Sequence, residues 1–444
     1  MSDAGAGFAV GTISSQAVRG GAYLAARYGL GVLVSVGNML VMTWWIGPHA
    51  YGLFVTAIGL AAFVASLARG GVDTYLVRSG PEPDARIYGT AVTFVLAASV
   101  GLGLASAAAI PLLVRWFGSR EFVLPYLVLL LTIPITALTG VPTAKLERAL
   151  DFRSVAGIEL AAQAAGLLVA ALLAWSHSGI WAPVIGQIVW QASTLVGVWT
   201  RASIPVRLSF EPVEARKMLT FGTGLTASLR TWQLRTLVNP LLVGKFVGAE
   251  GVAFVALAIR IAESLGTFRL AAGRMAIATL ARLQDKHDEF RSTLERVLFL
   301  QVITLGPLLC GFALLGPLLL KHAIGARWLP SLDVYPFVAA GVLVNSVYNL
   351  QASGLFVMGR QWTVMKSYTA HVVLLAVGTL VLLPRVGIAA YGWAELLACS
   401  AYLLIHSSLA RTVTVSYRRL APSVAGFLVG LFLIPASHAL LSMN

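Results

Sequence analysis

The chain has 444 residues, of which 58% are hydrophobic and 11% charged, and its formal net charge is +14. A soluble domain of this length needs far more polar residues to cover its surface, so the composition excludes an ordinary globular enzyme in water. The basic residues lie in short loops between apolar runs, a placement that anionic lipid headgroups explain better than a nucleic-acid partner does.

Apolar runs of about 20 residues recur along the chain, and each is long enough to cross a hydrocarbon core as a helix. The composition therefore predicts an all-α polytopic membrane protein with twelve or thirteen transmembrane helices. The expected spans, in chain order, are 22–46, 52–77, 87–114, 122–141, 154–175, 180–200, 219–245, 252–281, 292–320, 331–356, 364–384 and 388–410. The stretch 421–441 is either a thirteenth span or a segment that lies on the membrane surface. Residues 1–20 lack a short apolar core with a cleavage site, so we expect no cleaved signal peptide.

The basic residues are unevenly divided between the two sides of these spans. Twenty lie in the even-numbered loops and the N-terminal segment, and six lie in the odd-numbered loops. Basic loops stay on the cytoplasmic side, so the bias predicts a bacterial inner (cytoplasmic) membrane protein with a cytoplasmic N-terminus.

The longest interior hydrophilic stretch, Arg201–Met218, divides the chain near its middle. Two short sequence matches at similar offsets relate the halves: Ile46–Phe54 resembles Val247–Phe254, and Gly179–Ala182 resembles Gly387–Ala390. They favour a duplicated six-helix unit, with pseudo-twofold symmetry and a central cavity between two lobes. The expected division is an N-terminal six-helix lobe (1–200), a cytoplasmic linker (201–218), a C-terminal six-helix lobe (219–410), and a basic loop with an additional hydrophobic helix (411–444).

Ionisable side chains at membrane depth are costly, about 2.5–3.5 kcal/mol each, and usually face a wet cavity. The seventh and eighth expected spans concentrate them, and helical spacing places Arg260, Glu263 and Arg274 on one face. Arginine suits a diphosphate because its planar guanidinium bonds two oxygens at once. The candidates for binding a diphosphate and its sugar are Arg230, Gln233, Arg235, Asn239, Arg260 and Arg274. The alternative is that Arg260 pairs with Glu263 while Arg230 or Arg274 extends to an interface.

Acidic residues within the spans are candidates for ion coupling, namely Glu159, Glu263 and Glu395. Glu159 and Glu395 suit a polar bridge between helices equally well. Arg69 and Asp73, four residues apart, are a candidate gate pair, with a simple helix-surface pair as the alternative. The loops contain no phosphate-binding motif, nucleophile elbow or acidic pair. We therefore expect no enzymatic activity, catalytic residue, cofactor or metal.

Several segments resemble, in order and spacing, the polysaccharide transporter family of the multidrug/oligosaccharidyl-lipid/polysaccharide exporter superfamily. The resemblance covers roughly residues 20–410. The segments that carry it are Trp45–Phe54, Lys145–Arg153 running on to Glu159, Gly179–Gln187, Phe221–Gly222, Gly244–Gly248 and Pro384–Ile388. Relatives often carry Asp five residues before the glycine that closes the seventh span. Asn239 stands there in this chain, which removes a titratable group.

The resemblance implies two six-helix lobes that open alternately to either side of the membrane. It implies a flippase that translocates polyprenyl-diphosphate-linked oligosaccharide units for polysaccharide export, such as lipopolysaccharide or exopolysaccharide. The partners expected are the lipid-linked oligosaccharide and the membrane, with a polysaccharide polymerase and glycosyltransferases alongside a monomeric chain. The alternatives are a multidrug exporter or a peptidoglycan-precursor exporter of the same superfamily, a membrane glycosyltransferase, and a passive scaffold for a synthesis complex.

Overall fold

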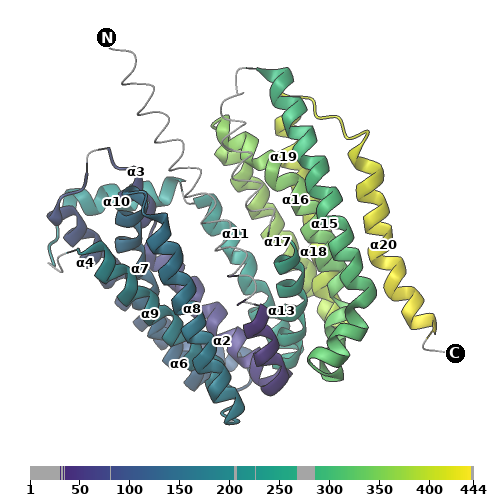
Figure 1. Ribbon diagram of the computed structural model, residues 1–444, viewed down its shortest axis with the longest axis horizontal. Coiled ribbons are helices and arrows are strands. Elements are labelled where there is room, and N and C mark those ends of the chain that lie inside the picture. Colours follow the sequence, from purple (N-terminus) through teal and green to yellow (C-terminus); the bar gives the residue numbers. More distant parts are fainter. Residues whose placement is uncertain are drawn as a thin grey trace. The chain divides into compact units, whose positions relative to one another are not determined.

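The computed structural model describes residues 31, 34, 36–80, 82–204, 208–225, 227–267 and 286–441. Every regular element in these ranges is a helix, which confirms the expected all-α class (Figure 1). The chain packs as two compact units. Unit 1 contains residues 1–45, 61–112 and 123–226, and unit 2 contains residues 46–60, 113–122 and 227–444. Residues 46–60 and 113–122, which fall in the first half of the sequence, thus pack with the second half.

Unit 1 is a helical bundle whose helices are each largely apolar. Its elements are the second part of α2 (Pro48–Arg69), α3 (Val72–Arg78), α4 (Ala85–Ala108), α6 (Val123–Leu130), α7 (Thr132–Arg148), α8 (Phe152–Trp175), α9 (Trp181–Ala202) and α10 (Pro212–Leu225). A buried cluster that includes Leu76, Val92, Ile133 and Met218 forms the core where α3, α4, α7 and α10 meet.

Local signals set the ends of these helices. The carboxylate of Asp84 accepts the backbone N–H of Ile87 at 2.8 Å and begins α4, and Asp151 does the same for Ser154 at 3.2 Å at the start of α8. These are ordinary N-cap bonds. The expected span 52–77 lies within one candidate span, Pro48–Arg78, in which α2 and α3 meet at Gly70 and Gly71, whose φ values of +62° and +81° other residues rarely adopt.

Charged side chains fasten the loops at one end of unit 1. Arg148 donates to the backbone carbonyl oxygens of Leu76 at 3.1 Å, Ser79 at 2.6 Å and Gly80 at 2.9 Å, and so caps α3. The carboxylate of Glu214 accepts hydrogen bonds from Lys217 at 2.6 Å and from the Tyr75 hydroxyl at 2.9 Å, which together lower its pKa. These basic residues therefore bond to other groups of the protein.

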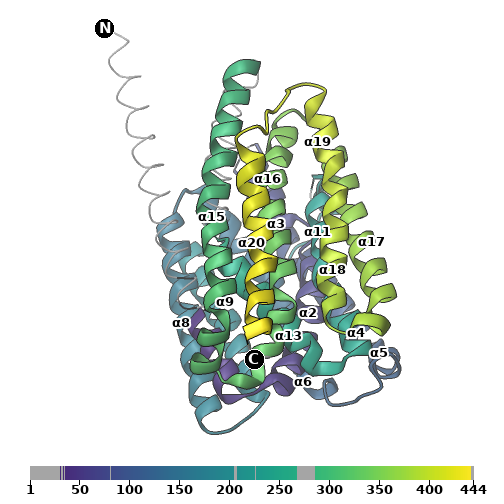
Figure 2. The same ribbon diagram turned by 90° about the vertical axis from the view of Figure 1, so that its right-hand side faces the viewer.

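Unit 2 contains the longest helices of the chain. Its elements are the first part of α2, the end of α5 (Ile110–Phe117), α11 (Ala227–Val238), the π-helix η1 (Asn239–Val243), α12 (Gly244–Phe246), α13 (Gly248–Leu265), α15 (His287–Ala323), η2 (Ala326–Asp333), α16 (Tyr335–Val357), α17 (Gln361–Val386), α18 (Ala389–Cys399), η3 (Ser400–Tyr402), α19 (Leu403–Ala410) and α20 (Leu420–Leu441). The two views show α15, α16 and α20 side by side (Figures 1 and 2).

Seven helices in the described residues are long and apolar enough to cross a membrane, and an eighth is counted if η2 and α16, which meet at 50°, form one span. The expected span 219–245 contains the end of α10, then α11, η1 and α12, and residue 226 between α10 and α11 lies outside the described residues. Much of the expected span 252–281 lies outside the described residues. The expected stretch 421–441 forms α20, which packs against α15 and α16.

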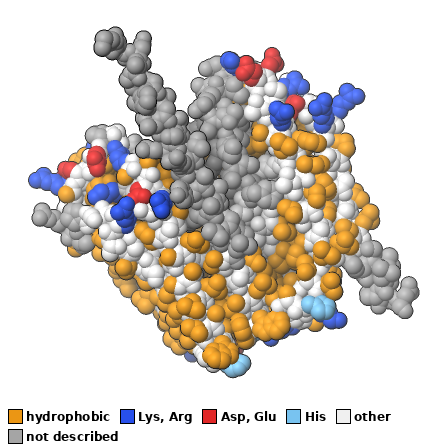
Figure 3. Space-filling view, viewed as in Figure 1, with side chains coloured by type: hydrophobic (Ala, Val, Ile, Leu, Met, Phe, Trp, Pro, Cys, Tyr) orange, Lys and Arg blue, Asp and Glu red, His pale blue; other side chains and the backbone are white. Residues whose placement is uncertain are grey.

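The surface of each unit has the pattern of a membrane protein. In the space-filling view, hydrophobic side chains cover the flanks of the helices and charged side chains gather at one end of each unit (Figure 3). Large side chains such as Leu104, Leu168 and Leu318 are at least 60% exposed on these flanks. Exposed apolar surface of this extent is typical of contact with lipid.

Candidate functional site

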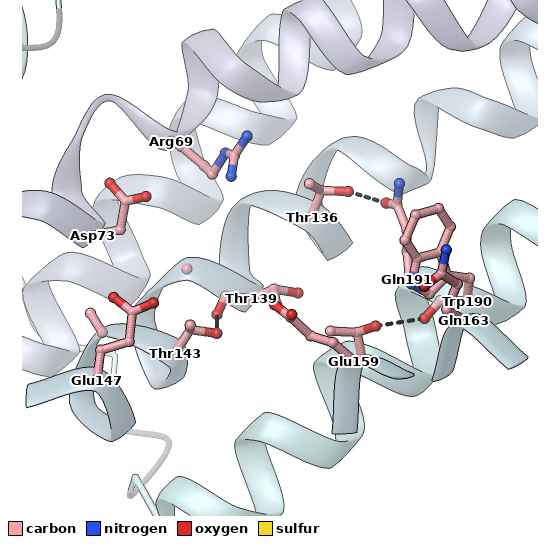
Figure 4. Close-up of a pocket in the computed structure, with 13 residues that line it drawn as sticks. Arg69, Asp73, Thr136, Thr139, Thr143, Glu147, Glu159, Gln163, Trp190 and Gln191 are labelled. Atoms are coloured by element: carbon pink, nitrogen blue, oxygen red, sulfur yellow. Dashed lines mark hydrogen bonds between the residues drawn. The ribbon is translucent and has the colours of Figure 1, made fainter. Parts of the chain in front are cut away.

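A polar pocket of about 390 Å³ lies inside unit 1 (Figure 4). Its walls come from the junction of α2 and α3 and from the three consecutive helices α7, α8 and α9. Figure 4 shows Arg69 and Asp73 at one end of the pocket and Trp190 and Gln191 at the other. Three of the sequence-derived candidates, Arg69, Asp73 and Glu159, therefore face the same space.

Helix α7 presents a stripe of threonines to the pocket. Thr136, Thr139 and Thr143 follow the i, i+3, i+7 spacing of one helical face, with Gly140 between them. The hydroxyls of Thr139 and Thr143 each donate to the carbonyl oxygen four residues earlier, at 2.8 Å, so their oxygens keep free acceptor capacity. A Cβ at Gly140 would make an ordinary van der Waals contact with the Cβ of Asp73, at 3.5 Å, so the start of α3 lies next to α7 here.

Helices α8 and α9 form the opposite wall. Glu159 and Gln163 are one helical turn apart on α8, and their side chains point toward one another (Figure 4). Trp190, Gln191 and Thr194 line the pocket from α9, and the Thr136 hydroxyl donates a hydrogen bond to the Gln191 carbonyl oxygen. The wall thus offers an indole face, two amides and a carboxyl group.

Arg69 and Asp73 were candidates for a gate pair or a helix-surface pair. In the described residues no ion pair joins their side chains within 4.0 Å. Asp73 instead accepts the backbone N–H of Thr74 at 2.8 Å. Both residues line the pocket together with Glu147 and Glu159, so the part of the lining that the structure describes holds three acidic side chains and one basic side chain.

A second, smaller pocket of about 190 Å³ lies inside unit 2, between α11, α13, α16, α17 and α18. The buried guanidinium of Arg235 dominates it. Its Nη2 lies 3.0 Å from Oε1 of Glu395, and its Nη1 lies 3.6 Å from Oε1 of Glu263. Its guanidinium carbon also lies 5.3 Å from the ring centre of Trp232, a cation–π distance.

The histidine His371 completes the cluster around Glu395. It is fully buried; its Nδ1 lies 3.1 Å from the carbonyl oxygen of Ala398 and its Nε2 lies 3.7 Å from Oε2 of Glu395. Its ring stacks on Tyr402 with a centroid separation of 5.1 Å. Gly341 makes room for the acid, because a Cβ there would lie 2.8 Å from Cγ of Glu395. Glu395 is therefore a polar bridge that ties α18 to α11 and α17.

Arg235 was a candidate for binding a diphosphate. In the structure two acidic side chains reach its guanidinium, Glu263 from α13 and Glu395 from α18. Two carboxylates offset the charge of Arg235, and its side chain is only 10% exposed. Arg235 thus forms an internal ion-pair network, the arrangement expected of a structural charge at membrane depth.

The other sequence-derived candidates are spread over unit 2. Arg260 is exposed on α13, and Gln233 is half-buried on α11. Asn239 is buried in the π-helix η1, where its amide nitrogen donates to the carbonyl oxygen of Val252 at 3.1 Å. The side chain of Arg230 and the whole of Arg274 lie outside the described residues. In the described ranges, no group of three or more His, Cys, Asp or Glu residues lies close enough to hold a metal ion.

Sequence reasoning missed most of the polar lining of unit 1. Thr136, Thr139, Thr143, Gln163 and Gln191 carry no charge, and the search for costly residues in the spans considered ionisable groups. The sequence did contain a signal for this lining, because these uncharged polar residues recur at helical spacing within apolar runs. Trp190 lies near the middle of the expected span 180–200, away from the interfaces where tryptophan is common. This position was a second signal that could have identified it as a lining residue.

Three comparisons place this architecture among known proteins. A family model described as "Polysaccharide biosynthesis protein" matches residues 41–333. The comparison with curated sequences found no match. The structure is similar to lipid II flippase MurJ in an inward closed conformation, with a TM-score of 0.72 and 12% identity over 96% of this chain and 100% of that one.

Two further structures share the architecture. An inward-facing multidrug resistance MATE family transporter of the MOP superfamily has a TM-score of 0.66 and 14% identity, over 85% of this chain and 96% of that one. A MOP superfamily transporter from Pyrococcus furiosus, described by the reverse polarity of its binding pocket, has a TM-score of 0.59 and 14% identity, over 94% and 96% of the two chains. These likenesses show a transporter fold. Since the family model covers most of the chain, the protein belongs to the polysaccharide biosynthesis protein family and has the fold of the MurJ and MATE transporters.

Proposed function

We propose that this protein is a flippase that translocates polyprenyl-diphosphate-linked oligosaccharides across the bacterial inner membrane for polysaccharide export. The observation that carries the proposal is the polar pocket of about 390 Å³, most of whose walls come from segments apolar enough to cross a membrane, namely Pro48–Arg78, Val123–Arg148 and Phe152–Trp175. The family match to polysaccharide biosynthesis proteins supports a saccharide cargo.

The physical requirement for such a transporter is a polar path for the headgroup. A saccharide hydroxyl that enters hydrocarbon without a hydrogen-bond partner costs about 4–8 kcal/mol, so several hydroxyls make unassisted crossing prohibitively slow. Threonine, glutamine and acidic side chains in unit 1 replace the hydrogen bonds that water makes. The polyprenyl tail needs no such replacement and stays in lipid.

The diphosphate needs fixed positive charge. The basic residue best placed for this role in the described part of unit 2 is Arg260, which is exposed on α13. Arg230 and Arg274 stay predicted contributors. Arg235 is less suited, because Glu395 and Glu263 already hold its guanidinium.

We propose that the headgroup crosses by alternating access, with one compact unit moving as a body against the other. Such a change needs only a few kcal/mol of differential binding between two states. The bias of basic residues toward even-numbered loops supports an inner-membrane location with a cytoplasmic N-terminus. A polysaccharide polymerase and glycosyltransferases are the proposed partners, because they would use the cargo on the two sides.

The test is reconstitution of the full chain in liposomes that contain undecaprenyl diphosphate carrying a fluorescent saccharide. A membrane-impermeant quencher applied outside reports the fraction of headgroups in the outer leaflet over time. We expect exchange of headgroups between leaflets that empty liposomes lack. No exchange, combined with increased resistance of a pump-deficient host to cationic drugs, would identify a multidrug exporter instead. Glycosidic bond formation by the purified chain would identify a glycosyltransferase.

A further inference from the structure

We propose that the pocket in unit 1 is a saccharide-binding subsite that accepts neutral or amino sugars and rejects acidic ones. This inference rests on the proposed function and names the part of the cargo that the pocket holds. The subsite consists of lining side chains on α7, α8 and α9, together with Arg69 and Asp73 (Figure 4).

The size of the pocket suits a sugar. A volume of about 390 Å³ falls within the range of about 300–1,000 Å³ that small-molecule sites occupy. All of the lining residues that the structure describes belong to one compact unit, unit 1.

The lining combines the two kinds of contact that sugars need. A pyranose ring has a face of C–H groups that packs on an aromatic plane, and Trp190 supplies an indole in the wall. The ring is edged by hydroxyls that both donate and accept. The hydroxyl oxygens of Thr139 and Thr143 can accept hydrogen bonds, because their protons already bond to backbone carbonyls, and the amides of Gln163 and Gln191 add donors.

One hydrogen bond fixes the orientation of a key amide. The Thr136 hydroxyl on α7 donates a hydrogen bond to Oε1 of Gln191, so the carbonyl oxygen of that amide faces α7. The NH₂ group of Gln191 points away from that bond and is a donor for a sugar oxygen. An amide held in this way loses little conformational entropy when a ligand binds.

The charge balance of the lining sets the selectivity. Among the described lining residues, Asp73, Glu147 and Glu159 contribute acidic groups and Arg69 contributes a basic one. A sugar carboxylate in this space meets like charges, whereas a hydroxyl or an ammonium group meets acceptors. A cargo of uronic acid is therefore disfavoured, and a neutral or amino sugar is favoured.

The test measures equilibrium binding to the full chain in lipid nanodiscs, which avoids sugar-based detergents. The probes are undecaprenyl diphosphate alone and the same lipid carrying one N-acetylhexosamine, one amino-hexose or one hexuronic acid. We expect the wild type to bind the neutral or amino sugar lipid about tenfold more tightly than the bare lipid, and the uronate lipid no more tightly than the bare lipid.

Variants locate the effect. Trp190→Ala and Gln163→Leu should remove the preference for the glycosylated lipid and leave binding of the bare lipid unchanged. Thr139→Val, which deletes one hydroxyl at constant shape, serves in case Trp190→Ala fails to fold. Trp175→Ala is the matched control, because Trp175 is on α8 but 71% exposed and outside the pocket lining. Asp73→Asn with Glu159→Gln should raise the relative affinity for the uronate lipid.

Equal wild-type binding of all four lipids would overturn the subsite and leave the proposed diphosphate transport standing. A wild-type preference that survives in Trp190→Ala, Gln163→Leu and Thr139→Val would place sugar recognition elsewhere and overturn the assignment to this pocket. Tighter binding of the uronate lipid would overturn the selectivity. Failure to bind any of the four lipids would remove the proposed function and this inference together.

Discussion

Arg235 on α11 and Glu395 on α18 form a buried ion pair, with Nη2 of the arginine 3.0 Å from Oε1 of the glutamate. The side chains are only 10% and 2% exposed. Two charges removed from water are stable only when each keeps its partner, and His371 adds a further contact to Glu395 at 3.7 Å. The pair therefore holds three helices of unit 2 together.

We predict that Glu395→Gln destabilises the protein by about 3–5 kcal/mol, because it leaves a buried guanidinium with only the more distant Glu263. Glu263→Gln is the control and should have a small effect, since the Glu263 side chain is 47% exposed. Thermal unfolding of the purified variants in nanodiscs measures both changes. The double variant Arg235→Met with Glu395→Leu should recover much of the loss. A wild-type Tm for Glu395→Gln would show that the pair contributes little.

A second prediction separates transport from stability. Arg260→Ala should slow headgroup exchange in liposomes about tenfold at an unchanged Tm, because Arg260 is exposed and a guanidinium binds phosphate oxygens bidentately. Arg235→Ala, in contrast, should lower the Tm, because it leaves the buried carboxylate of Glu395 without its arginine partner. Arg260→Lys should keep part of the rate, since lysine retains the charge without the planar fork. Wild-type exchange by Arg260→Ala would exclude this residue from diphosphate binding.

The sequence predicted the fold class and most helix positions for a simple reason. A lipid environment requires long apolar helices, and hydropathy together with Asp151 at the start of α8 and Gly387 at the end of α17 indicates where these helices begin and end. Local irregularities were harder to predict. Hydropathy does not detect the two left-handed glycines between α2 and α3, or the π-helix at Asn239–Val243 within the expected seventh span.

The candidate site was predicted only in part because it depends on contacts between distant segments. The sequence indicated Arg69 with Asp73 as one candidate pair and Glu159 as a separate candidate, because all three are ionisable residues in apolar runs. The structure brings them into one pocket. The ion pair of Arg235 with Glu395 joins residues 160 positions apart, so no helical spacing indicates it. Thr139 resembles any helical threonine that bonds to the preceding turn.

A third prediction concerns the packing of the pocket wall. Gly166 on α8 lies against α9 so closely that a Cβ there would be 2.7 Å from the Cβ of Trp190 and 2.7 Å from the carbonyl oxygen of Gly186. We predict that Gly166→Ala destabilises unit 1 by about 1–3 kcal/mol, since the helices must separate. Gly157→Ala on the same helix is the control; it meets nothing within 4 Å and should be neutral or slightly stabilising. Equal Tm values for the two variants would contradict this packing.

The last prediction is a pH dependence at the start of α8. The Ser154 side chain, and to a smaller extent the Arg201 guanidinium 2.8 Å from Oδ2, lower the pKa of Asp151 below its ordinary value of about 4. Because the folded state favours the ionised carboxylate, this group stabilises the protein above its unfolded pKa, and the contribution is lost as the pH falls through the folded pKa. Asp151→Asn keeps an N-cap acceptor and loses the charge. The Tm difference between wild type and Asp151→Asn should therefore be present at pH 7 and shrink steadily below about pH 4. Arg201→Gln should reproduce part of this change, and a Tm difference that stays constant from pH 7 to about pH 3 would show that the charge of Asp151 has no role in stability.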